Sequence, residues 1–179
     1  MLKTLLAIAL AVALGPLAAQ AADHPDLFAL TSPDFTDNGF LSAPNAGTGT
    51  STRGPWACGG QNVSPALAWT HAPAGTQSFA VIMDDPDAAS GRGGNHWVAY
   101  GIPASATSVP RDAGKTSGYH GPCAEPDAKT HHFLWMVFAL DLPPAAFAPG
   151  LTREQFMQQI SGHSLAEASL VSRYQPRSK

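Results

Sequence analysis

Proline is spaced so densely along this chain that long helices are excluded from most of it. The sequence has 16 prolines in 179 residues, and between Pro25 and Pro149 no proline-free stretch exceeds about 17 residues. A proline inside a helix removes a hydrogen bond and costs about 3 kcal/mol, so helices in this region must be short. Only the stretch between Pro149 and Pro176 leaves room for a longer one.

Short apolar runs in the middle of the chain predict β-strands. The clearest cover residues 78–83, 96–102 and 132–140, and residues 67–69 form a weaker candidate. The run at 132–140 is apolar at alternate positions on both faces, which predicts a central strand covered on both sides. Segments rich in turn residues lie between the runs.

The C-terminal region predicts one helix and a final strand. Thr152 and Gln155 have the spacing of a capping box. Phe156 and Ile160 share one face of the helix that would follow, and Gly162 is a typical stop. Residues 169–174 favour a last strand. The expected fold is therefore one domain, mainly β with a helical tail.

The first 21 residues have the features of a signal peptide. A lysine at position 3 precedes the apolar run 5–14, and Ala19 and Ala21 are the small residues that a signal peptidase requires. A membrane anchor is the alternative, but it needs about 20 apolar residues, and Pro16 interrupts this run. We expect cleavage after Ala21 and export of residues 22–179 as a single periplasmic or secreted domain, without a lipid anchor or transmembrane segment.

Composition excludes several classes of partner. The formal net charge is −3 and charged residues make up 13% of the chain, about half the usual share. No basic field is available to attract nucleic acid or an anionic membrane. The apolar share of 44% is large enough for a core and argues against disorder.

The two cysteines, Cys58 and Cys123, are expected to form a disulfide. Two cysteines in an exported chain are more often paired than free. The alternative is two unpaired buried thiols. Neither cysteine belongs to a Cys-x-x-Cys motif, which argues against thiol redox catalysis.

Polar residues adjoin the ends of the three main predicted strands. Asp85 and Asp87 follow the first, His96 opens the second, and His131 opens the third after the glycine-rich segment 118–122. If these strands are neighbours, carboxylate, imidazole and glycine backbone meet at one rim. Imidazolium donates to phosphate oxygens and glycine leaves its N–H accessible, so such a rim suits a small anion that can share a proton.

Other interpretations of these residues remain open. His131 and His132 lie on opposite faces of one strand, so at most one of them serves a given site. Each histidine could be structural, Asp87 could form a turn or a salt bridge, and two aspartates with one or two histidines could bind zinc. No nucleophile elbow, phosphate-binding loop or dinucleotide motif is present. Asn62 begins a glycosylation triplet that carries little weight because Pro65 follows it.

Four ordered blocks of sequence resemble the phosphatidylethanolamine-binding protein family, and its bacterial Raf-kinase-inhibitor-like branch most closely. They are residues 85–88, 95–98 with 102–103, 118–123 and 131–140, and residues 58–69 are similar as well. The resemblance extends over roughly residues 27–174. It implies a large antiparallel sheet packed on a smaller one, with short helices and a C-terminal helix.

The resemblance also implies a shallow anion pocket without a cofactor or metal. Phosphate, phosphorylethanolamine and acetate are the ligands that it accepts. The implied ligand-binding residues are Asp85, Pro86, His96, Gly121, Pro122, His131 and Phe133, supported by Asp87, Trp97 and His132. Two of them depart from the family pattern, which usually has tyrosine at Phe133 and arginine at His132. A hydroxyl and a permanent charge are thereby lost, which weakens the expectation of tight phosphate binding.

The favoured function is that of an exported, non-catalytic protein that binds a phosphate-like anion or a phospholipid headgroup. One alternative is inhibition of a protease or another enzyme through a loop at residues 47–60 or 85–95. A third possibility is a hydrolase that uses His96 and Asp85 as acid and base. No activated serine or cysteine supports it.

Overall fold

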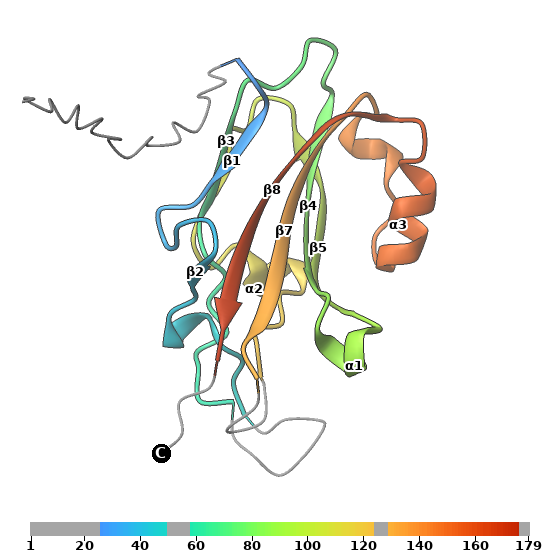
Figure 1. Ribbon diagram of the computed structural model, residues 1–179. Helices are drawn as coiled ribbons and strands as arrows, with labels where there is room; N and C mark the ends of the chain where they lie inside the picture. Colours follow the sequence, from blue (N-terminus) through green and yellow to red (C-terminus); the bar gives the residue numbers. More distant parts are fainter. Residues whose placement is uncertain (1–25, 50–57, 124–128, 176–179) are drawn as a thin grey trace, which may run out of the picture.

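Two β-sheets packed face to face make up the computed structural model, which describes residues 26–49, 58–123 and 129–175 (Figure 1). The larger sheet has the strand order β2-β8-β7-β4-β5, and the smaller has the order β1-β3-β6. The predicted signal peptide lies outside the described residues. No helix of the described part is long and apolar enough to cross a membrane.

Strand β7 (His131–Leu140) is the centre of the larger sheet, as the sequence predicts. It pairs antiparallel with β4 (Ser78–Asp85) on one side and with β8 (Ser164–Tyr174) on the other. β5 (Gly94–Pro103) continues the sheet beyond β4. The short β2 (Gly39–Phe40) joins β8 in parallel and is the one departure from an antiparallel arrangement in the described sheet.

One face of the larger sheet packs against the smaller sheet, which consists of β1 (Ala29–Thr31), β3 (Leu67–Thr70) and β6 (Ser108–Val109). The shared core includes Trp69 from the smaller sheet and Trp135 from the larger. Burial of aromatic side chains of this size is the main source of stability in such a sandwich.

The opposite face of the larger sheet is covered by the helix α3 (Arg153–Gln159) (Figure 1). Met136 and Phe138 of β7 pack there with Phe156 of the helix. The prediction that β7 is covered on both sides is therefore confirmed. Thr152 caps α3 by accepting a hydrogen bond from the Gln155 N–H, which confirms the predicted capping box.

The other helices are single turns, as the proline spacing requires. They are α1 (Ala88–Gly91), α2 (Gly114–Ser117), and the 3₁₀ turns η1 (Ala43–Asn45) and η2 (Pro144–Ala146). The last strand begins at Ser164 rather than at the predicted Ser169. In the first part of this strand, the half-buried Ala166 and Ala168 alternate with exposed residues. This part has no apolar run, so the sequence does not predict that the strand begins there.

Candidate functional site

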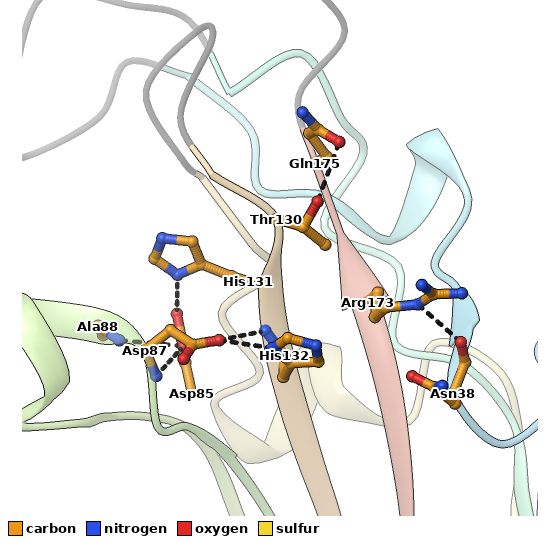
Figure 2. Close-up of polar contacts among 9 residues, drawn as sticks. All are labelled: Asn38, Asp85, Asp87, Ala88, Thr130, His131, His132, Arg173 and Gln175. Carbon is orange, nitrogen blue, oxygen red and sulfur yellow. Dashed lines mark hydrogen bonds and ion pairs between the residues drawn. The ribbon is translucent and has the colours of Figure 1, made fainter.

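Asp85, the last residue of β4, is a buried carboxylate that accepts three hydrogen bonds. Its Oδ1 accepts the backbone N–H groups of Asp87 at 2.9 Å and Ala88 at 3.1 Å. Its Oδ2 lies 2.7 Å from Nδ1 of His131 (Figure 2). These contacts fix the carboxylate at the start of the turn between β4 and α1.

His131 opens β7, next to the end of β4 in the sheet. Because the ionised carboxylate of Asp85 only accepts hydrogen bonds, Nδ1 of His131 carries the hydrogen in this contact. The side chain keeps 20% of its surface exposed. Nε2 lies on the far side of the ring from Asp85 (Figure 2).

A β-bulge turns His96 toward the same face of the sheet. Asp84 pairs with Asn95 and Met83 with Trp97, which leaves His96 as the extra residue on β5. In a regular strand His96 would face away from the core that contains Trp97, but a bulge re-aims a side chain. The His96 ring accordingly packs edge-on against Phe133, with the ring centroids 5.2 Å apart.

Phe133 is the apolar floor that joins the two imidazoles. It is buried, and the ring of His131 stacks on it at a centroid distance of 6.5 Å. The structure therefore brings Asp85, His96, His131 and Phe133 together at one end of the sheet, and we call these four residues the Asp–His rim. The sequence-based expectation that the strands adjoin here is confirmed.

The segment that precedes Gly121 forms one wall beside His96. Nδ1 of His96 lies 2.6 Å from the carbonyl oxygen of His120, to which it donates, and the His120 N–H donates to the His96 carbonyl at 2.8 Å. Gly121 and Pro122 follow and are buried. A Cβ on Gly121 would lie 2.2 Å from the Asn45 carbonyl oxygen, so only glycine fits.

The expectation of an accessible glycine N–H is wrong at Gly121. Its N–H donates to Oδ1 of Asn62 at 2.7 Å, while Nδ2 of Asn62 donates to the Tyr119 carbonyl at 2.9 Å. Gly118 uses its N–H to close α2 onto the Gly114 carbonyl. The wall is thus held by internal bonds. Asn62, which the sequence marked only as the start of a glycosylation triplet, is the residue that holds it.

Trp97 and Pro86 each follow a rim residue in the chain, His96 and Asp85 respectively. The Trp97 indole is buried, donates from Nε1 to Oγ of Ser117 at 2.9 Å, and packs edge-on against Tyr119. Burial raises the pKa of the Tyr119 phenol. Pro86 is exposed in the turn after Asp85. Both therefore shape the surroundings of the rim.

Asp87 and His132 form a second pair on the other face of β7. Oδ2 of Asp87 accepts both the backbone N–H and Nδ1 of His132, each at 2.8 Å (Figure 2). The backbone hydrogen bond, followed by the side-chain bond, lowers the pKa of Asp87 below its ordinary value of 3.8. Both side chains are nearly half exposed. This pair ties the turn after β4 to the start of β7.

Cys58 and Cys123 are bonded to each other, as predicted. The bridge follows directly after Pro122, whose carbonyl accepts the N–H of Gly47. The bridge joins the wall of the rim to Cys58, whose N–H donates to the Gly49 carbonyl at 2.9 Å. Residues 50–57 lie outside the described residues, so the inhibitory loop at 47–60 stays a prediction.

Two cavities lie near the rim. One of about 790 Å³ lies along β5, and one of about 410 Å³ is lined by Asp84, Asp85 and Pro86, so it borders the rim at Asp85. Neither is lined by His96 or His131. Within the described residues no group of three or more histidine, cysteine, aspartate or glutamate side chains is arranged to hold a metal ion.

The model of the phosphatidylethanolamine-binding protein family matches residues 31–175 of this chain. The UPF0098 protein YbhB of Escherichia coli is 36% identical over 133 residues, which cover 64% of this chain and 83% of YbhB. A UPF0098 protein of Methanothermobacter thermautotrophicus is 35% identical over 66% of this chain and 87% of its own length.

The same family appears among solved structures. The crystal structure of E. coli YbcL, described as a member of the mammalian PEBP family, superposes with a TM-score of 0.74 at 28% identity. The match covers 83% of this chain and 98% of YbcL. Sheet order, rim residues and relatives lead to one conclusion: the chain belongs to the phosphatidylethanolamine-binding protein family.

Proposed function

We propose that this chain is an exported, non-catalytic protein that binds a small phosphate-like anion at the Asp–His rim. The observation that carries the proposal is the Asp85–His131 contact, which directs the second ring nitrogen of His131 away from the protein's own carboxylate. Family membership supports a binding role, because the family is described by the phospholipid that its members bind.

The chemistry of the rim favours an anion that can share a proton. As an imidazolium, His131 donates from Nε2 to a phosphate oxygen in a charge-assisted hydrogen bond. As a neutral imidazole with its hydrogen on Nδ1, it accepts from a protonated phosphate. The carboxylate of Asp85 adds a negative charge nearby, so binding is expected to be weak.

A binding role fits the rim better than hydrolysis does. His131 contacts a carboxylate rather than a hydroxyl or a thiol, and both cysteines are consumed by the disulfide. A nucleophilic mechanism needs a base within hydrogen-bond reach of the nucleophile. Asp85 already accepts three hydrogen bonds from the protein, which argues against a role as general base.

The proposal is tested by titration calorimetry with phosphorylethanolamine. His131→Gln should weaken binding about tenfold or more, because a charge-assisted hydrogen bond contributes about 1.5–3 kcal/mol. His163→Gln is the matched control, since His163 makes a similar 2.8 Å contact with Asp141 away from the rim. Ethanolamine alone should produce no heat. Equal affinity of both variants for phosphorylethanolamine would rule out the rim as the binding site.

Export is the second part of the proposal. The composition of residues 1–21 supports it, and a disulfide is stable in an oxidising compartment. Expression of the full chain in a Gram-negative host should release a protein from the periplasm whose N-terminal sequence begins at Ala22. An unprocessed N-terminus in the cytoplasmic fraction would contradict it.

A further inference from the structure

The larger of the two cavities, about 790 Å³, is a groove that runs along β5. Its floor is formed by six residues of β5: Asn95, Trp97, Val98, Ala99, Tyr100 and Ile102. One bank is built by α2 with Val109, and the other by residues 150–154 at the start of α3. We call this feature the β5 groove. It is distinct from the Asp–His rim, because neither His96 nor His131 lines it.

The floor of the groove is an open strand edge. β5 is the last strand of its sheet and pairs with β4 on one side only. At its beginning the outer side is used, since the His96 carbonyl accepts the His120 N–H. Backbone groups of alternate residues face the same side of an antiparallel strand, so the N–H and C=O of Val98 face the groove.

Each bank of the groove combines apolar and polar residues. Val109 and Ala113 lie on one side and Leu151 on the other, where its N–H donates to the hydroxyl of Tyr100 in the floor at 2.8 Å. A groove with hydrogen-bonding backbone in its floor and apolar residues on both banks is complementary to an extended peptide.

The bank at the start of α3 carries two charged residues, and they differ in their ion pairing. Arg153 is paired with Asp84, with its Nε 2.7 Å from Oδ2. Glu154, the other charged residue in this bank, is exposed and makes no ion pair with the described residues. The end of the groove near Glu154 is therefore complementary to a basic side chain.

We propose that the β5 groove binds an extended segment of a partner protein by β-strand addition. The segment adds a sixth strand beside β5, exchanges backbone hydrogen bonds with Val98, and places alternate apolar side chains against the two banks. A lysine or arginine of the segment lies beside Glu154. This interaction is independent of anion binding at the Asp–His rim.

The probe is a six-residue peptide of alternating valine and threonine with one terminal lysine and with both termini blocked. It is titrated into ¹⁵N-labelled protein that comprises residues 22–179. The amides of Val98 and Tyr100 should shift and become protected from hydrogen exchange. The same peptide N-methylated at alternate residues should bind at least tenfold more weakly, because it cannot donate to the Val98 carbonyl. This comparison leaves the protein unchanged, so it does not depend on the folding of a variant.

A protein variant completes the test. Val98→Pro removes an N–H that faces the groove and leaves the bonds to β4 intact, which proline tolerates on an edge strand. It should lose the peptide and keep its affinity for phosphorylethanolamine, whereas His131→Gln should do the reverse. Three results would each overturn the proposal: no β5 amide shift at millimolar peptide, equal binding of the methylated peptide, or self-association of the chain through β5 in sedimentation.

Discussion

Two carboxylates of one Asp-Pro-Asp turn hold neighbouring histidines on opposite faces of β7. Asp85 holds His131 on the face of the rim, and Asp87 holds His132 on the other face. Because Asp87 also accepts the backbone N–H of His132, it anchors the turn to β7 and keeps Asp85 in place. Asp87 therefore ties the turn that carries Asp85 to the start of β7.

The lowered pKa of Asp87 makes the stability of this anchor depend on pH. A folded-state pKa below 3.8 means that the contribution of Asp87 is complete above pH 3.8 and is lost as the pH falls through the lowered value. Asp87→Asn should destabilise the fold at neutral pH by less than about 1 kcal/mol, because the pair is nearly half exposed. Urea unfolding across this range should show the difference vanish in acid. A difference that is constant with pH would contradict the argument.

Gly121 is the residue of the wall that tolerates substitution least. Its added Cβ would lie 2.2 Å from the Asn45 carbonyl oxygen, a contact that backbone must move to relieve. Gly121→Ala should reduce the free energy of unfolding by about 3 kcal/mol or more. Gly47→Ala is a graded control, since its nearest contact would be 3.1 Å. Equal destabilisation by the two variants, measured by urea unfolding, would show that this contact does not matter.

At the scale of elements, the strands were predictable and the bulge was not. The apolar runs predicted β4, β5 and β7, and proline spacing predicted that the helices between them would be short. The strict alternation of a strand would have placed His96 and Trp97 on opposite faces, and only the pairing of Asp84 with Asn95 shows that His96 is an extra residue. The position of His96 at the start of a predicted strand, and then the resemblance to the family, identified this residue.

Interactions between distant segments were also hidden from the sequence. Asn62 bonds to Tyr119 and Gly121, which lie more than 50 residues away along the chain, so no local pattern marks it as part of the wall. The β5 groove is similar in this respect. Its two banks come from residues 109–120 and 150–154, and only the fold brings them to one edge.

The cap of α3 is a prediction at this same scale. Oγ1 of Thr152 accepts the Gln155 N–H at 3.2 Å, and Oε1 of Gln155 accepts the Thr152 N–H at 2.9 Å. Thr152→Ala should reduce the free energy of unfolding by about 1 kcal/mol. Thr152→Ser should restore most of it, because serine keeps the hydroxyl. No difference between the alanine and serine variants in urea would show that the cap contributes nothing.

For the whole molecule, the two proposed sites lie at different places on the larger sheet. The rim lies where β4 ends and β7 begins, near α1 (Figure 1). The groove lies along the outer edge of β5. The disulfide links residues 65 positions apart and fixes the wall of the rim to the rest of the fold. A small domain gains stability from such a link because its unfolded chain is constrained.

Removal of the disulfide tests this role. The double variant Cys58→Ser with Cys123→Ser should lose about 2–4 kcal/mol of stability while keeping a single unfolding transition. Circular dichroism during urea unfolding measures both. If the variant matched the stability of the oxidised protein, the bridge would be dispensable.

The central claim is that His131 and His96 together receive a phosphate group, and nuclear magnetic resonance of the histidine rings tests it most directly. Long-range ¹H–¹⁵N spectra follow each ring nitrogen during titration with phosphorylethanolamine. We predict that Nε2 of His131 and the ring of His96 shift with one common binding curve, while His163 does not move. Unchanged His131 and His96 signals at saturating ligand would contradict the account.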